Sequence, residues 1–92
     1  MSNKIKCSHI LVEKQSESQV ILEKIKAGEK FGNLAKEFST DKGSGKREGN
    51  LGYFTKGMMV KPFEDAAFKL QIGEISEPVK TEFGYHVIKR TG

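Results

Sequence analysis

The sequence predicts one small domain that mixes strands and helices in the order β-α-α-β-α-β-β. Two segments, residues 4–13 and 85–90, alternate their side chains as strands do. Three others, residues 17–27, 31–38 and 63–70, carry apolar residues at helical spacing. Eight of the ten glycines lie between these segments. A chain of 92 residues has room for one core, because a domain of this size buries only about 60–65% of its unfolded surface. Residues 1–92 are therefore expected to form a single domain.

The first strand, residues 4–13, is expected to lie in the middle of a sheet. Ile10 and Val12 point to one face, and the other face carries four residues: Ile5, Cys7, His9 and Leu11. Apolar residues on both faces are typical of a strand that is covered on both sides.

Two helices follow. Residues 13–18 are polar and predict a loop, with Ser16 as a candidate N-cap. Residues 17–27 predict a helix that ends at Gly28, with an apolar stripe formed by Val20, Ile21, Leu22 and Ile25. A second helix, ending near Ser39, is predicted by the spacing of Phe31, Leu34, Ala35 and Phe38.

The second half alternates loops and short elements. Residues 40–50 contain three glycines and no large apolar side chain, which predicts a loop. Residues 51–55 predict a strand in which Gly52 allows a close backbone approach. Pro62 suits the first turn of a helix, whose apolar face would hold Phe63, Ala66, Ala67 and Leu70. Pro78 restricts the extended residues 75–81 to an edge or a strand start.

The last strand, residues 85–90, alternates again, with His86 and Ile88 on one face and Tyr85 and Val87 on the other. The candidate functional residues therefore include two histidines, on the first and the last strand.

Charge and cysteine content limit the functional classes. The excess of 16 basic over 12 acidic residues, +4, favours weak attraction to anionic surfaces but does not by itself indicate a nucleic-acid binder. Cys7 is the single cysteine, so no internal disulfide forms, and a reducing compartment is expected. The apolar run near the N-terminus is too short for a signal peptide or a membrane span. A cytoplasmic protein is expected.

Five motifs together resemble one known family. They are HILV at 9–12, FSTD at 38–41, GNLGYF at 49–54, MVKPFEDAAF at 59–68 and FGYHVIKR at 83–90. In this order and spacing the chain resembles the parvulin peptidyl-prolyl cis/trans isomerases, in particular the small stand-alone type of archaea and bacteria. The resemblance implies an α+β fold, in which three to four short helices wrap a four-stranded, mostly antiparallel sheet.

The resemblance also implies roles for individual residues. The catalytic positions would be His9, Asp41, Thr81 and His86. The substrate proline ring would be held by Leu51, Met59 and Phe63, with Phe83 beside that pocket. Without the family resemblance, the cluster of Met58, Met59 and Val60 is more typical of a hydrophobic core. With the resemblance, Met59 is assigned to the pocket, and Met58 stays undecided between core and pocket.

The implied reaction is rotation about an X–Pro bond, whose amide resonance imposes a barrier of roughly 18–20 kcal/mol. An enzyme must bind the twisted amide better than the planar forms, which requires no covalent step, cofactor or metal. Asp41 could act on the substrate carbonyl or only tune the histidines. For His9 and His86 we favour structural organisation over proton transfer. The scattered His, Cys and Asp residues lack the short spacing of metal ligands.

The expected substrates are proline-containing peptides and unfolded or partly folded proteins, bound by a monomer that assists folding. No phosphate requirement is expected, because residues 13–18 contain Glu13 and Glu17 with Lys14 as the only base. Phe83 suggests an apolar or long residue before proline. Two alternatives stay open. One is a non-enzymatic peptide-binding chaperone, and the other is a binder of lipid or nucleic acid through the lysines 4, 6, 42, 46, 56 and 80.

Overall fold

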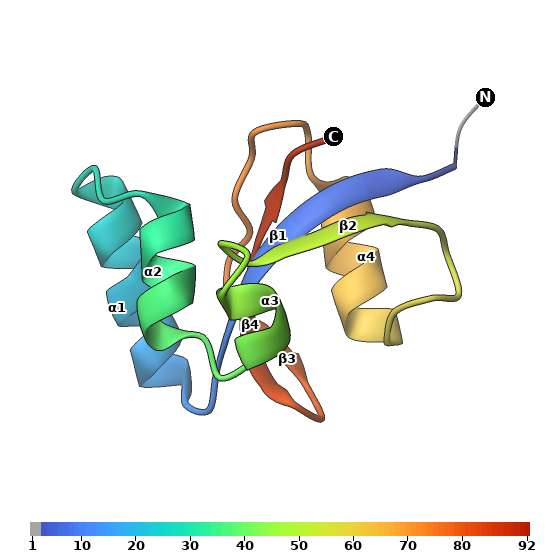
Figure 1. Cartoon of the computed structure of the whole chain (residues 1–92). Coiled ribbons are helices and arrows are strands. Elements are labelled where there is room, and N and C mark those ends of the chain that lie inside the picture. The colour runs from blue at the N-terminus through green and yellow to red at the C-terminus, as the bar shows by residue number, and fades with distance from the viewer. Residues whose placement is uncertain (1–2) are drawn as a thin grey trace.

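The computed structural model describes residues 3–92 as a four-stranded sheet with helices on both faces (Figure 1). The elements are β1 (Ile5–Val12), α1 (Gln15–Lys26), α2 (Phe31–Phe38), α3 (Lys42–Gly45), β2 (Asn50–Phe54), α4 (Lys61–Lys69), β3 (Val79–Thr81) and β4 (Gly84–Arg90). The strand order is β2-β1-β4-β3 and every pair is antiparallel. The predicted α+β class is confirmed. Among the described residues, no helix is long and apolar enough to cross a membrane.

Strand β1 lies between β2 and β4, as its two apolar faces predicted. It pairs with β4 from Cys7 opposite Arg90 to Val12 opposite Tyr85. It pairs with β2 from Ile5 opposite Phe54, with a shift of register between Cys7 and Ser8. This central strand therefore delivers side chains to both sides of the sheet.

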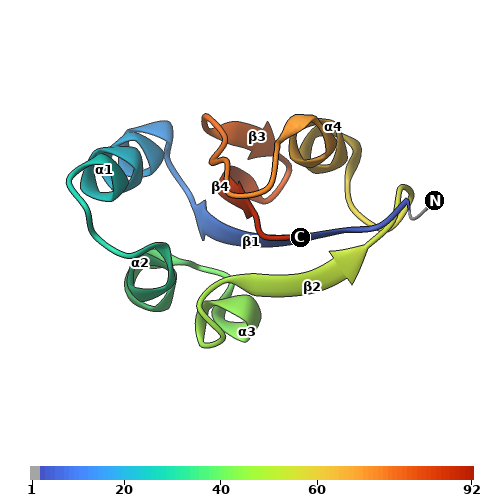
Figure 2. The same ribbon diagram turned by 90° about the horizontal axis from the view of Figure 1, so that it is seen from above.

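One face of the sheet is closed by α1 and α2 (Figure 2). Ile10, Val12 and Val87 project from the strands on this side. The helices cover them with buried side chains, and the helical members of the cluster are Ile21, Leu22, Phe31, Leu34 and Ala35. The periodic spacing predicted for α2 is confirmed at Phe31, Leu34 and Ala35, which all point inward, but not at Phe38, which is 36% exposed.

The opposite face is covered by α4 at one end. Ile5, Cys7 and Ile88 of the sheet pack there, and their partners are Phe54, Phe63, Ala67 and Leu70. Pro62 lies in the first turn of α4, as expected from its missing N–H. Further along the same face, His9, Leu11 and His86 line a pocket instead of packing beneath the helix.

The start of α1 differs from the sequence prediction. The helix begins at Gln15, so the loop predicted over residues 13–18 is only two residues long, and Ser16 is not the N-cap. The first turn is instead held by Glu17, whose carboxylate accepts a hydrogen bond from the Lys14 backbone N–H at 2.9 Å. An acidic side chain is favourable here because the helix dipole is positive at this end.

The buried stripe of α1 also differs. Val20 is 47% exposed, and Ser18 is fully buried in its place. Ser18, Ile21, Leu22 and Ile25 follow the i, i+3, i+4, i+7 spacing, whereas Val20 falls outside it. Ser18 tolerates burial because its hydroxyl donates to the Gln15 carbonyl.

The segment predicted as a loop, residues 40–50, contains the short helix α3, and that prediction is wrong in this part.

Gly52 was expected to allow a close backbone approach, but a Cβ there would meet no atom within 4 Å. Its φ of +76° instead suits glycine at the register shift in β1–β2. The close approach occurs at Gly49, where an added Cβ would lie 2.4 Å from the His9 carbonyl oxygen.

Strand β3 is confirmed as an edge strand. Only Val79–Thr81 of the extended residues 75–81 pair regularly with β4, and Pro78 immediately precedes them. Ile75 adds an isolated bridge to Lys89. Pro78 has no backbone N–H to donate, but no hydrogen bond between strands is lost because the strand starts after it.

Candidate functional site

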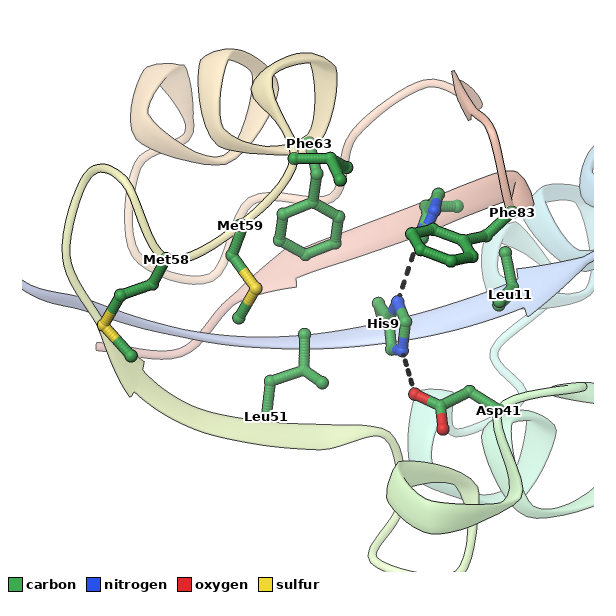
Figure 3. Close-up of a pocket in the computed structure, with 10 residues that line it drawn as sticks. His9, Leu11, Asp41, Leu51, Met58, Met59, Phe63 and Phe83 are labelled. Carbon is green, nitrogen blue, oxygen red and sulfur yellow. Dashed lines mark hydrogen bonds and ion pairs between the residues drawn. The ribbon is translucent and has the colours of Figure 1, made fainter.

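A pocket of about 510 Å³ opens beside α4, on the face of the sheet opposite α1 and α2 (Figure 3). Ten residues line it: His9, Leu11, Asp41, Leu51, Met58, Met59, Val60, Phe63, Phe83 and His86. The structure therefore brings seven of the eight predicted site residues to one pocket wall. Thr81, the eighth, lies behind His86 and is hydrogen-bonded to it.

Three lining residues complete the pocket beyond the predicted set. Met58, which the sequence left undecided, lines the pocket and is 64% exposed. The sequence placed Leu11 on a strand face and Val60 in an apolar cluster with Met58 and Met59, but it assigned neither residue to the pocket. Leu11 could have been found because it follows His9 by two residues and so shares its face of β1.

The two histidines meet on the pocket floor. The Nδ1 atoms of His9 and His86 lie 2.9 Å apart, and the rings are stacked with centroids 5.1 Å apart. Both side chains are buried. The edge-on ring of Phe63 lies 5.7 Å from the His9 ring and 5.2 Å from the His86 ring, centroid to centroid. The floor of the pocket is thus a packed cluster of three rings.

Asp41 approaches His9 from the start of α3. Its Oδ2 lies 2.8 Å from His9 Nε2, and dashed lines in Figure 3 mark this contact and the one between the histidines. Asp41 also caps α3, because its Oδ1 accepts from the Ser44 backbone N–H at 3.4 Å. The cap explains why an aspartate three residues before a serine can start a helix in a glycine-rich segment.

Ser44 is a site residue that sequence reasoning missed. Its hydroxyl donates to Asp41 Oδ2 at 2.7 Å and lies 3.1 Å from His9 Nε2. The signal that could have found it is the spacing Asp41-x-x-Ser44, which is typical of a capped helical turn.

Thr81 closes the other end of this network. Its Oγ1 lies 2.7 Å from His86 Nε2 and accepts a hydrogen bond from the Phe83 backbone N–H at 3.1 Å. The tight turn between β3 and β4 thereby places the Phe83 ring, which is 60% exposed, at the pocket rim.

Burial and hydrogen bonding shift the pKa values of three of these groups. Burial lowers the pKa of His86 to about 4, helped by the neighbouring His9. Burial also lowers the pKa of His9, although the Asp41 carboxylate opposes the shift. For Asp41, burial raises the pKa, but hydrogen bonds from Ser44 and His9 outweigh it and the net pKa lies below its usual value. At neutral pH both imidazoles are uncharged and Asp41 is ionised.

These charge states fix the position of every proton in the network. The ionised Asp41 can only accept, so His9 carries its proton on Nε2 and donates to the carboxylate. His9 Nδ1 is then bare and accepts from His86 Nδ1–H. His86 Nε2 is bare in turn, so the Thr81 hydroxyl donates to it. All bonds from the Phe83 N–H through Thr81, His86 and His9 therefore point toward Asp41.

This order leaves the imidazoles fully occupied. Each of the four ring nitrogens has a protein partner: Thr81, the other histidine, or Asp41 with Ser44. Asp41 differs, because its side chain is 34% exposed toward the pocket. The carboxylate is therefore the one charged group of the pocket wall that a ligand can approach directly.

Cys7 stands apart from this chemistry. It is fully buried beneath α4, and burial raises the pKa of its thiol to about 11, so the reactive thiolate is disfavoured. Within residues 3–92, no three His, Cys, Asp or Glu side chains gather as metal ligands would.

The sequence matches the model of a protein family described as the PPIC-type PPIase domain, over residues 1–92. Among solved structures, the chain is similar to NmPin, the parvulin of Nitrosopumilus maritimus. Identity is 77%, coverage is 100% of this chain and 99% of the other, and the TM-score is 0.90. Pin of the psychrophilic archaeon Cenarchaeum symbiosum is 72% identical, with coverage of 100% and 95% and a TM-score of 0.87.

A longer relative is the foldase protein PrsA of Geobacillus kaustophilus, which is 52% identical over 88 residues. These residues make up 96% of this chain but 31% of the PrsA chain. The chain thus spans about a third of the length of the PrsA proteins that it matches.

Proposed function

The chain belongs to the PPIC-type peptidyl-prolyl isomerases, the parvulin family, and on this basis we propose that it catalyses rotation about X–Pro bonds without a covalent step. The observation that carries the proposal is the pocket itself, in which apolar side chains surround a neutral histidine pair and one carboxylate stands at the side. Its dimensions and lining suit a pyrrolidine ring held against Phe63, between Leu51, Met59 and the rim residue Phe83.

Such a pocket can lower the barrier by binding alone. The planar amide is stabilised by resonance that places negative charge on its carbonyl oxygen, and the twisted amide has lost this charge. An apolar wall therefore accepts the twisted form more readily, and differential binding of this kind is what accelerates a reaction. The flexible thioether of Met59 can follow the ring as the bond turns.

Asp41 is assigned the electrostatic role. A carboxylate near the substrate carbonyl disfavours the resonance-charged planar amide, whereas His9 and His86 have no free nitrogen to donate or accept a proton. We expect Asp41→Asn to lower kcat about tenfold or more, because the amide oxygen still accepts from His9 Nε2 but the charge is gone. NMR exchange rates at saturating peptide measure this. An unchanged rate in a folded variant would show that the carboxylate only orients His9.

The proposed substrates do not need a phosphate before proline. The β1–α1 connection consists of Glu13 and Lys14, and the charge in the pocket wall is the negative Asp41, which would repel a dianion. The exposed ring of Phe83 favours an apolar or long residue at that position. Fastest turnover with phosphoserine or glutamate in a peptide series would contradict both statements.

Proline-containing peptides and partly folded proteins are the proposed partners, in keeping with the relatives that are named foldases. Action as a monomer in the cytoplasm is part of the proposal. The proposed location rests on Cys7, the single cysteine of the sequence, which is buried and forms no disulfide.

The test is catalysed exchange between the cis and trans signals of a short X–Pro peptide in NMR. Faster exchange on addition of the protein supports an isomerase. Chemical-shift changes at Met59 and Phe83 with unaltered exchange would instead support the alternative of a peptide-binding chaperone that leaves the barrier unchanged.

A second proposal, weak association with anionic surfaces, is favoured by one observation. On the side of the molecule away from the pocket, a polar hollow of about 410 Å³ is lined by Lys6, Arg47 and Lys89, with Glu48 as the only carboxylate. Binding to anionic vesicles that falls steeply with salt would support a lipid surface, and salt-dependent binding to DNA alone would favour nucleic acid. No binding at low salt would exclude both.

A further inference from the structure

One wall of the pocket is a loop without regular secondary structure. We call residues 55–60, between β2 and α4, the methionine loop. It supplies three of the ten lining residues, Met58, Met59 and Val60. Figure 3 shows Met58 and Met59 on this loop, on the side of the pocket opposite Asp41 and Phe83, with the Met59 side chain pointing inward. The width of the pocket therefore depends on where this loop is held.

The hydrogen bonds described within the loop are weak anchors. The Met58 N–H donates to the Thr55 carbonyl at 3.3 Å, and the Thr55 N–H donates to the Met58 sulfur at 3.4 Å. Both close inside the loop and do not join it to the body of the protein. A bond from the loop to a rigid element is needed to hold the wall in place.

Glu64 provides such a bond. It lies in the first turn of α4, and its Oε1 accepts from the Gly57 backbone N–H at 2.7 Å. Gly57 has a φ of +95°, a conformation that glycine adopts without strain and that turns its N–H toward the helix. This bond ties the middle of the methionine loop to α4.

The burial of Glu64 marks it as unusual for a helix surface position. It is 7% exposed, and a buried carboxylate is tolerated only where partners replace its water. Its partners are the Gly57 N–H and, at 3.9 Å, the Lys61 ammonium. The side chain of the next residue, Asp65, is 52% exposed, against 10% for the side chain of Glu64, and pairs with the same lysine at 3.1 Å.

We propose that Glu64 is a positioning residue that sets the methionine loop over the proline pocket. It follows Phe63 directly, so the same helical turn holds the floor of the pocket through Phe63 and its wall through Glu64. Loss of the bond would let Met58 and Met59 move away from the ring, whereas Val60 stays joined to α4 because the Glu64 backbone N–H donates to its carbonyl at 3.0 Å. This inference rests on the proposed isomerase function and predicts a change in substrate binding, because the His9–Asp41 network is untouched.

The experiment compares Glu64→Ala, Glu64→Gln and Asp65→Ala. For each, NMR titration gives the dissociation constant of an X–Pro peptide, and exchange spectroscopy gives the rate at saturation. Glu64→Ala is expected to weaken binding on the order of fivefold with the saturated rate within about twofold. Glu64→Gln keeps an acceptor oxygen and should recover most of the binding, and Asp65→Ala should match the unmodified protein.

Unchanged affinity in a folded Glu64→Ala variant would overturn the proposal. So would Glu64→Gln binding as poorly as Glu64→Ala, or a loss of the saturated rate as large as that of affinity. If Glu64→Ala fails to fold, hydrogen exchange in the unmodified protein decides: a protected Gly57 amide supports the bond, and exchange as fast as in a free peptide overturns it. Absence of any catalysis by the unmodified protein would defeat the proposed function instead, and the peptide affinities would still test the role of Glu64.

Discussion

The two faces of the sheet are built from alternate residues of the same strands and yet have opposite characters. Ile10 and Val12 of β1 lie under α1 and α2, in a fully apolar cluster. His9 and Leu11, their immediate neighbours in sequence, lie on the floor of the open pocket. The difference arises because two helices cover the first face, whereas α4 covers only one end of the second.

A small domain can contain a buried polar network on one face of its sheet when the other face supplies the stability. Hydrophobic burial on the helix-covered face is non-directional and proportional to area, so it can stabilise the chain regardless of the pocket. On the other face each buried polar atom has a partner: among the described residues, no buried side-chain nitrogen or oxygen lacks a hydrogen bond. Stability and recognition can therefore be disturbed separately, and four experiments test this separation.

The largest effect is expected from Leu34→Ala on the covered face. Leu34 is 1% exposed in the α1–α2 cluster, and such truncations cost about 2–5 kcal/mol through lost burial and the cavity left behind. Urea unfolding measures the loss, and the peptide exchange rate of the folded variant should stay unchanged. A folded variant with a damaged exchange rate would mean that the two faces are coupled.

The second experiment concerns pH and the pocket face. Because the folded pKa of His86 is lowered from 6.5 to about 4, the unfolded chain binds a proton more readily than the folded one between these values. The contribution of neutral His86 to the free energy of unfolding should be fully present above about pH 6.5. It should fall toward pH 4, by up to about 3 kcal/mol. Urea unfolding at several pH values measures this fall. An NMR titration in which the His86 imidazole titrates near pH 6.5 would contradict it.

The third experiment removes the hydroxyl at the end of the network. Thr81→Val deprives His86 Nε2 of its donor and the Phe83 N–H of its acceptor, at a cost of about 1–3 kcal/mol in unfolding free energy. The exchange rate should also fall, because Phe83 is no longer held at the rim. Thr81→Ser keeps the hydroxyl and is the matched control. Equal stability of the two variants would show that the bonds are not needed.

The smallest free-energy effect is expected at the open wall. Met59 is only half buried, so Met59→Ala should change unfolding free energy by about 1 kcal/mol or less. It should nevertheless lower kcat/KM about tenfold, which corresponds to about 1.4 kcal/mol of transition-state binding. If stability fell much more than activity, Met59 would be a core residue, the alternative that the sequence left open.

Much of this architecture could be predicted from side-chain periodicity. The alternation around His9 and around His86 placed each histidine on a face of its own strand, and the spacing of Phe31, Leu34 and Ala35 defined α2. The family resemblance supplied what periodicity could not, namely that Met59 and Phe63 face a pocket. Their apolar character alone is equally compatible with a core.

The errors have physical reasons. The helix α3 is four residues long and glycine-containing, so it has no apolar period, and its cap comes from Asp41. The burial of Ser18 could not be predicted from an apolar pattern, because its hydroxyl is buried only by donating a hydrogen bond to the Gln15 carbonyl. The role of Glu64 could not be predicted, since no local pattern reveals that a carboxylate will bind a loop residue seven positions earlier.

The one-way arrangement of hydrogen bonds from Phe83 to Asp41 has a consequence for titration. A proton added to His9 Nδ1 would face the proton already carried by His86 Nδ1, 2.9 Å away, whereas a proton added to His86 Nε2 requires only that the Thr81 hydroxyl accept instead of donate. The two imidazoles are therefore coupled: uptake of the first proton disfavours the second, and the pair should titrate in two separate macroscopic steps that belong to neither ring alone.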